Sequence, residues 1–469
     1  MKFIGREKEL CLLRQKLNSD KTECMLIYGR RRVGKSELIK EALKGVDACL
    51  VQYVCRKSTF ALNLAAFGEE VAAAFNDKFA RFDKLGQLLE YVFGKAVDKK
   101  VVVVIDEYPF MRGDDEAIDS ELQIAIDTWQ HNACLKLILC GSYIDVMKKI
   151  IDREAPLFGR FSEIIRLRPF DYYDSAKFFP SASNEEKFFL YSVFGGIPFY
   201  LLQIDERISP QNNIERLIIP DGSVLENEIR LQLKMELAKE ENANYVLEKI
   251  AAGVGKYSDL AGGCPGSNGK INHTLGKLEG MNLIEKDSPI NHEKNHRYVI
   301  SDNLLDFYYT YIFRQITARN IMATDQFYET MVLPHIESEY LPRKFEQLAK
   351  EYLIRENKTG QFSPPLPAVG RYVYNDKKNR KNGEFDVVAK TERGNIFYEC
   401  KYKKSPVGMS IVNEELWQLK NLGLKFAKLG FFSKNSFSPD IDPNEYDLIT
   451  LDDMYRQLRP SDAVGCSLL

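Results

Sequence analysis

Short hydrophobic runs of strand length recur through the first third of the chain, with helical periodicity between them. Residues 24–28, 101–105 and 135–140 are such runs, and residues 36–43 follow the first with helical spacing. All five residues of 101–105 are β-branched, which is typical of a central parallel strand covered on both faces. The alternation predicts an α/β domain with a parallel sheet and helices on both faces.

Beyond residue 170 the pattern changes twice. Aromatic residues at helical spacing fill residues 170–202, and a mixed-charge amphipathic pattern predicts a helix within 212–239. Residues 244–301 have the spacing of a winged helix, with helices followed by two short strands whose connecting loop would be the wing. Residues 383–389 then alternate polar and apolar positions, and residues 395–401 are expected to be the partner strand of a hairpin.

Composition limits what this protein can be. At 469 residues the chain is too long for one core, so several domains are expected. The net charge of −2 means that any nucleic-acid site must be a local patch. The nine dispersed cysteines fit reduced thiols, and the apolar runs are too short for a membrane span. We therefore expect a cytoplasmic protein with no membrane partner, whose oligomeric state the sequence does not specify.

The segment after the first strand fits the pattern G-x-x-x-x-G-K-[ST]. Glycines let backbone N–H groups curl around phosphates, and the following helix adds positive potential at its N-terminus. Lys35 would reach the β and γ phosphates, and the Ser36 hydroxyl would bind Mg²⁺. The residues expected to bind ATP here are Gly29, Arg30, Arg31, Arg32, Val33, Gly34, Lys35, Ser36 and Glu37.

Acidic and polar residues end the next two strands. Asp106 is expected to hold Mg²⁺ through water, and Glu107 is placed to polarise the attacking water. Ser142 follows the strand 135–140, where two interpretations are open: it senses the γ-phosphate, or it only caps the next helix.

These stretches together resemble the archaeal-type ATPases of the AAA+/STAND class, many of which carry a C-terminal DUF234 region similar to PD-(D/E)xK nucleases. The stretches that carry the resemblance are residues 3–10, 29–36, 105–107, 139–142, 156–160, 167–170 and 195–200. The resemblance implies a P-loop core (1–170), a helical lid (171–240), a winged helix (241–312), a linker (313–340) and a nuclease-like domain (341–469).

The resemblance also gives expectations for single residues. Arg160 matches the family's P-L-[YF]-G-R arginine, which implies either a phosphate contact or a structural salt bridge. Pro198 matches a Gly-x-Pro feature that would lie near the base. In the winged helix, Lys270, Asn272, His273 and Lys277 would face a DNA groove, but winged helices also dock proteins, and both interpretations are open.

Three residues of the hairpin share the chemistry of a nuclease. Asp386 and Glu399 would hold Mg²⁺, and Lys401 would orient or deprotonate a metal-bound water. Glu346, on a preceding helix, matches the helix acid of such nucleases. Residues 371–404 contain ten Lys/Arg and five Asp/Glu, a local balance of +5 that favours a phosphate partner. A nuclease-derived domain without activity is the alternative.

The sequence thus predicts an ATPase that binds ATP and Mg²⁺ and acts as a nucleotide-dependent switch on double-stranded DNA, with a nuclease-like module. The alternative is a nucleotide-controlled regulator, or a chaperone-like ATPase that contacts a protein partner through the winged helix, with an inert C-terminal domain.

Overall fold

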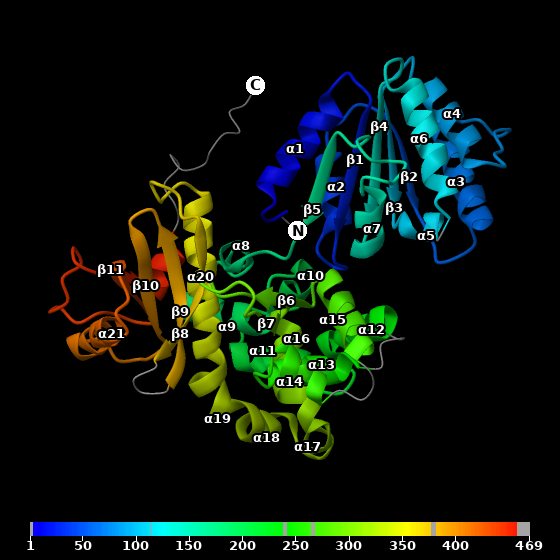
Figure 1. Cartoon of the computed structure of the whole chain (residues 1–469). Coiled ribbons are helices and arrows are strands. Elements are labelled where there is room, and N and C mark those ends of the chain that lie inside the picture. The colour runs from blue at the N-terminus through cyan, green and yellow to red at the C-terminus, as the bar shows by residue number, and fades with distance from the viewer. Residues whose placement is uncertain (1–2, 114, 238–241, 264–267, 377–380, 457–469) are drawn as a thin grey trace. The chain divides into compact units, whose positions relative to one another are not determined.

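The computed structural model describes residues 3–113, 115–237, 242–263, 268–376 and 381–456 (Figure 1). It divides into two compact units. The first runs to Pro169 and includes Ile197–Phe199, and the second takes the other described residues from Phe170 onward. Each unit is built from its own sheet or sheets and its own core.

The first unit contains a five-stranded sheet in the order β2-β3-β4-β1-β5, and every neighbouring pair is parallel. The strands are β1 (Glu23–Gly29), β2 (Cys49–Val54), β3 (Val101–Asp106), β4 (Leu135–Gly141) and β5 (Glu163–Leu167). The three apolar runs of the sequence are the three inner strands, β1, β3 and β4. The predicted parallel sheet is confirmed.

Helices cover both faces of this sheet, as expected (Figure 1). Side chains alternate along β3, so Val101, Val103 and Ile105 join one hydrophobic cluster while Val102 and Val104 join the other. One face is covered by α1 (Glu7–Asn18) and α2 (Lys35–Ala42). The other is covered by α3 (Phe60–Ala74), α4 (Leu85–Lys95), α5 (Pro109–Arg112), α6 (Ala117–Trp129) and α7 (Ile144–Ile150).

The second unit begins with one group of helices. Three further helices and a two-stranded antiparallel ladder follow them along the chain. The first helices are α8 (Tyr172–Ala176), α9 (Asn184–Phe194), α10 (Pro198–Leu201), which begins in the first unit, α11 (Pro210–Leu217) and α12 (Val224–Leu237). The next elements are α13 (Ala243–Ala251), α14 (Tyr257–Gly262), α15 (Asn268–Gly280), β6 (Ile284–Asp287) and β7 (Arg297–Ile300). This is the order of elements expected for residues 244–301.

The segment expected to be a linker, residues 313–340, is helical and partly buried, and the helical turns begin ten residues before it. Residues 303–340 form short helical turns, among which Phe327, Val332 and Ile336 are fully buried. The turns are α16 (Asn303–Phe307), η1 (Tyr308–Ile312), η2 (Phe313–Gln315), α17 (Ile316–Ile321), α18 (Thr324–Phe327), η3 (Tyr328–Val332), α19 (Leu333–His335) and η4 (Ile336–Tyr340). They lead into α20 (Leu341–Lys358). Burial of these apolar side chains makes the segment part of a core rather than a passive connection.

The C-terminal part of the second unit is a mixed five-stranded sheet in the order β12-β11-β10-β9-β8. The strands are β8 (Ala368–Asp376), β9 (Lys381–Thr391), β10 (Gly394–Lys401), β11 (Phe426–Ser433) and β12 (Asp447–Thr450), with helices α21 (Met409–Asn421) and α22 (Leu451–Met454). The predicted hairpin is confirmed, because β9 and β10 pair antiparallel with Tyr398 opposite Val387. The ladder ends at this pair, and Asp386 and Glu399 are the next residues along the two strands.

Candidate nucleotide site and C-terminal carboxylate cluster

The loop between β1 and α2 has the geometry that phosphate binding needs. Gly34 has φ 93° and Arg32 has φ 67°, so the chain enters the left-handed region twice. A Cβ on Gly29 would lie 2.3 Å from the Leu167 carbonyl oxygen, so only glycine fits there. The buried Lys35 ammonium donates to the carbonyls of Gly29 (3.0 Å) and Arg30 (3.1 Å), and therefore lies inside the loop.

The rest of the expected ATP-binding set lies around this loop in different environments. Arg30 and Val33 are buried, whereas Arg31, Arg32 and Glu37 are exposed. The Arg32 guanidinium stacks 4.2 Å from the centroid of the Phe199 ring, which belongs to the same unit. A Cβ on Gly34 would lie 3.8 Å from Pro198. The Gly-x-Pro segment therefore lies against the P-loop, and its contact with the base stays a prediction.

Asp106 reaches the P-loop from the end of β3. The Ser36 hydroxyl donates to Asp106 Oδ2 at 2.8 Å, across 70 residues of sequence. Asp106 Oδ1 accepts from the backbone N–H of Glu107 at 2.9 Å. Within the described ranges, no three His, Cys, Asp or Glu side chains form a group able to hold a metal ion. A hydroxyl and one carboxylate nevertheless fit Mg²⁺, which is usually held by one or two protein oxygens together with substrate phosphates.

The Glu107 carboxylate is bound by Ser142, which directly follows the neighbouring strand β4. Both of its carboxylate oxygens lie 2.8 Å from the Ser142 hydroxyl, and Oε2 also accepts from the Ser142 backbone N–H at 3.1 Å. Glu107 itself has φ 51°, which is uncommon outside glycine. The residue at the N-cap of α7 is Tyr143, so the Ser142 hydroxyl serves Glu107. Sensing of the γ-phosphate by Ser142 stays a prediction.

Arg160 has a partner in its own unit. Its guanidinium binds Asp127 through two nitrogens, at 3.2 and 3.0 Å, and donates to the Phe158 carbonyl at 2.7 Å. This is the structural salt bridge that was one of the two expectations. A contact between Arg160 and phosphate stays a prediction.

A buried polar network behind Glu107 was missed in the sequence. Asp119, which is 1% exposed, accepts from the Tyr108 hydroxyl (2.7 Å) and from Arg112 Nε (2.7 Å). Burial, and then the Asp119 carboxylate, raise the pKa of Tyr108 well above its usual range. Asp119 lies on the apolar face of α6 between the buried Ile118 and Leu122. The signal that could have revealed this network is the acidic residue itself, which stands in the sequence at a position where helical spacing predicts a buried apolar side chain.

In the C-terminal sheet, the predicted acids influence one another electrostatically. Burial, and then the charges of Asp386 and Glu399, raise the pKa of Glu346 on α20 to about 8. Burial, followed by Glu399 and Glu384, raises the pKa of Asp386 to about 6. The Lys401 ammonium forms an ion pair with Glu399 Oε1. The carboxylates thus share one region, although in the described chain they do not form a group that meets the requirements of a metal site.

Three further residues bear on this cluster. Glu415 on α21 was missed, and burial followed by the Glu399 charge raises its pKa to about 7. Gln418, also on α21, donates to the Tyr374 hydroxyl at 3.0 Å. Glu384 is bound by Arg297 and Arg371.

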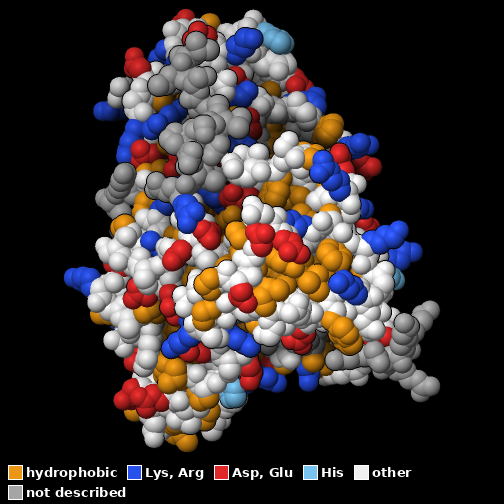
Figure 2. All heavy atoms as spheres, turned by 90° about the vertical axis from the view of Figure 1, so that its left-hand side faces the viewer, with side chains coloured by type: hydrophobic (Ala, Val, Ile, Leu, Met, Phe, Trp, Pro, Cys, Tyr) orange, Lys and Arg blue, Asp and Glu red, His pale blue; other side chains and the backbone are white. Residues whose placement is uncertain are grey.

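The expected basic patch over residues 371–404 has fewer described and exposed Lys and Arg side chains than the count from the sequence indicated. Lys377, Lys378 and Arg380 lie outside the described residues, and Arg371 is only 6% exposed because it is paired with acids. On the face that Figure 2 shows, the described Lys and Arg side chains are interspersed with Asp and Glu and form no continuous basic area. In the expected recognition helix, Lys270, Asn272 and His273 are exposed and Lys277 is half-buried.

The fold and the P-loop geometry define a P-loop ATPase, and comparison with known proteins identifies its kind. Residues 3–204 match the family described as an ATPase domain predominantly from Archaea, and residues 308–416 match DUF234, a family of archaeal and bacterial proteins of unknown function. The chain therefore carries an archaeal-type ATPase domain followed by a DUF234 region, as the resemblance implied, whereas the STAND class and the likeness of the DUF234 region to nucleases stay predictions.

Individual relatives agree with this assignment. An uncharacterized protein of Methanocaldococcus jannaschii is 27% identical over 86% of this chain and 88% of its own. An uncharacterized ATP-binding protein of the same organism is 48% identical over 42 residues, which are 9% of this chain and 71% of that protein. A Walker-type ATPase of Pyrococcus abyssi shares the fold, with a TM-score of 0.51 and 20% identity over 66% of this chain and 96% of its own. None of the helices in the described ranges is long and apolar enough to cross a membrane.

Proposed function

We propose that this chain binds and hydrolyses ATP with Mg²⁺ at the P-loop and acts as a nucleotide-dependent switch on DNA. The observation that carries the ATPase part is the hydrogen bond between Ser36 and Asp106, 2.8 Å long, beside Lys35 and Glu107. Lys35 and Ser36 begin α2, and Asp106 and Glu107 lie at and just after the end of β3, which supports a site for the γ-phosphate between these two segments.

Each of these residues has a separate task in the proposed reaction. Lys35 exchanges the two carbonyls that it now contacts for phosphate oxygens, which bring a stronger opposite charge. Ser36 and Asp106 hold Mg²⁺, which neutralises charge on the phosphates when it is bound. Glu107 orients and polarises the attacking water.

The DNA part of the proposal rests on the second unit. The order of elements from α13 to β7 supports a winged helix over 241–312, whose exposed Lys270, Asn272 and His273 would face a groove of double-stranded DNA. The antiparallel hairpin of β9 and β10, the effect of the Glu399 charge on the pKa of Asp386, and the salt bridge between Glu399 and Lys401 support a nuclease-like module over 341–469. We keep 1–170 as the ATPase core and 171–240 as the helical lid.

The first test is ATP hydrolysis with Mg²⁺, with and without double-stranded DNA. Glu107→Gln should lower turnover by roughly a hundredfold or more while ATP still binds, because the general base is lost. Lys35→Ala should abolish binding of ATP. Lys40→Ala, an exposed residue of α2, is the matched control and should behave as wild type. Turnover that persists in Glu107→Gln would contradict the ATPase part of the proposal. Turnover that DNA does not change would contradict the DNA part.

A regulator with an inert C-terminal module is the second candidate function. The observation in its favour is that the acids of this module do not form a metal-holding group within the described residues. Mg²⁺-dependent cleavage that is lost in Asp386→Ala and Lys401→Ala, with ATPase activity intact, would exclude it. ATPase activity stimulated by a protein and not by DNA would instead favour the chaperone-like alternative.

A further inference from the structure

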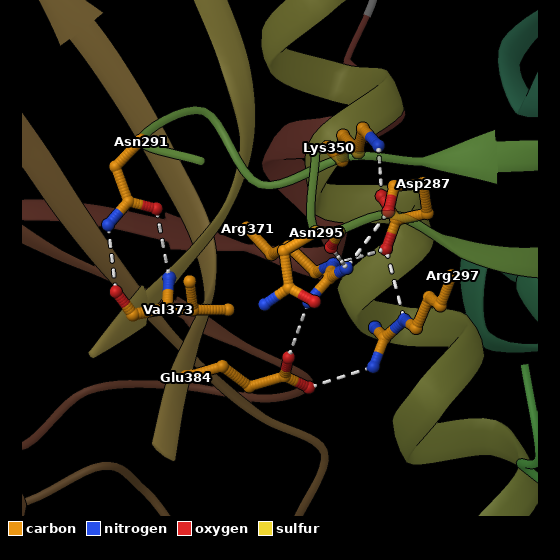
Figure 3. Close-up of polar contacts among 8 residues, drawn as sticks. All are labelled: Asp287, Asn291, Asn295, Arg297, Lys350, Arg371, Val373 and Glu384. Atoms are coloured by element: carbon orange, nitrogen blue, oxygen red, sulfur yellow. Dashed lines mark hydrogen bonds and ion pairs between the residues drawn. The ribbon is translucent and has the colours of Figure 1, made fainter. Parts of the chain in front are cut away.

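The wing between β6 and β7 is bound to the edge strand of the C-terminal sheet. The Asn291 side chain donates to the Val373 carbonyl (2.8 Å) and accepts from the Val373 N–H (3.1 Å), as Figure 3 shows. The backbone N–H of Ile290 donates to the Arg371 carbonyl at 2.9 Å. The Ile290 side chain packs on the core of the sheet. The wing therefore covers the β8 edge much as an added strand would.

An ionic network strengthens this contact (Figure 3). Asp287 of β6 binds Arg371 (2.8 Å), Arg297 (3.1 Å) and Lys350 (3.2 Å). Glu384 of β9 binds Arg297 (2.9 Å) and Arg371 (3.1 Å). Arg297 and Arg371 thus each join the winged-helix elements to the C-terminal sheet, so the carboxylate cluster and the wing form one structural region.

Two cavities lie between the C-terminal sheet and the winged-helix elements β6, β7 and the wing that connects them. One, of about 330 Å³, is lined by the candidate acids Glu346 and Asp386 and by Arg297 and Tyr298 of β7. The other, of about 620 Å³, shares Arg297 and Glu384 with the first and extends beneath the wing. Glu346 and Asp386 therefore face a cavity that β6 and β7 help to line, and a ligand in this cavity would reach these two acids.

The size and lining of the cavities restrict what can occupy them. Volumes of this order suit a ligand of one or a few nucleotides, at roughly 300–1,000 Å³, whereas a double helix cannot enter. The larger cavity is lined by Asn295 and Asn382, by Lys256 and by Tyr374, while the amide of Asn291, which also lines it, is bound to Val373. Amides and an ammonium can bind base edges and phosphate, and an aromatic ring can stack on a base.

We propose that the C-terminal module takes unpaired nucleic acid, such as a single-stranded end, into these cavities, and that the docked wing excludes duplex from its acids. The inference rests on the proposed nucleic-acid function and adds a substrate class to it. The winged helix then has two surfaces with separate roles: α15 remains available to duplex, while the wing selects unpaired strand at the acids.

The test is binding of fluorescent oligonucleotides to the full chain by anisotropy, with Ca²⁺ in place of Mg²⁺ to prevent cleavage. The probes are a labelled 12-nucleotide single strand and the same strand in a blunt duplex, each competed separately with unlabelled single strand and with unlabelled duplex. Lys256→Glu should weaken single-strand binding at least tenfold, because it reverses a charge in the cavity. Lys234→Glu, an exposed residue of α12 that lines neither cavity, is the matched control and should leave it unchanged.

A wing-release variant tests the exclusion of duplex. Ile290→Ala with Asn291→Ala removes the wing's side-chain contacts with β8, and should allow duplex to compete with the bound single strand at least tenfold better than in wild type. Equal weakening by both lysine variants, or competition by duplex in wild type as effective as that by single strand, would overturn the inference. Tight duplex binding without single-strand binding refutes this inference alone, whereas binding of neither probe refutes the nucleic-acid function as well.

Discussion

Replacement of Asp119 by alanine tests whether the buried network behind Glu107 supports the ATPase unit. The change leaves the Arg112 guanidinium, 7% exposed, with Glu116 at 3.2 Å as its other acidic partner, and it removes the acceptor of the Tyr108 hydroxyl. Breaking a buried ion pair from one side costs about 3–5 kcal/mol. For a unit of this size each kcal/mol lowers Tm by roughly 2–4 °C, so we expect a fall of about 10 °C.

The assay is differential scanning calorimetry of the full chain. Since a chain with two units need not unfold in one step, the transition of the ATPase unit is identified as the one that a bound ATP analogue raises. Asp127→Ala is the matched control on the same helix, because its pair with Arg160 is partly exposed and worth at most about 1 kcal/mol. Equal shifts in the two variants would refute the reasoning, since burial would then make no difference.

Three further predictions follow from single contacts. Ser142→Ala should lower kcat roughly tenfold with little change in ATP affinity, because Glu107 loses the hydroxyl that orients it; an unchanged kcat in steady-state assays would contradict this. Gly29→Ala should abolish binding of an ATP analogue in calorimetry, because its Cβ would lie 2.3 Å from a backbone carbonyl oxygen, whereas Gly94→Ala, with open space around it, should bind normally. Burial raises the pKa of Glu351 to about 7 from 4.5, so the folded state binds an extra proton between these values, and stability should fall by about 3 kcal/mol as pH rises through that window. Urea unfolding at pH 5 and pH 8 should show a loss of stability that is smaller in Glu351→Gln than in wild type by about this amount, and the loss that remains in the variant is expected from Glu346, Asp386 and Glu415, whose pKa values are also raised.

Much of the fold could be predicted because its signals are local. The β-branched run of β3 and the alternation in β9 reflect how many faces of a strand are buried, which depends on the residues of the strand itself. The P-loop was recognisable for the same reason, since its glycines and Lys35 are fixed by the conformation of one short loop. The hairpin itself follows from the short turn between two neighbouring strands, and it brings Asp386 and Glu399, the residues just beyond the ladder, to the same end of that ladder.

The sequence by itself therefore determined the class of the ATPase domain, its parallel sheet and the antiparallel hairpin of the C-terminal sheet. Only the tertiary structure decided how the side chains pair: Ser142 with Glu107, Arg160 with Asp127, and Asn291 with β8. These contacts join residues 33 to 82 positions apart, and no local pattern encodes them. A polar side chain can satisfy its hydrogen bonds in many ways, and the packing of distant elements selects the partner that it meets.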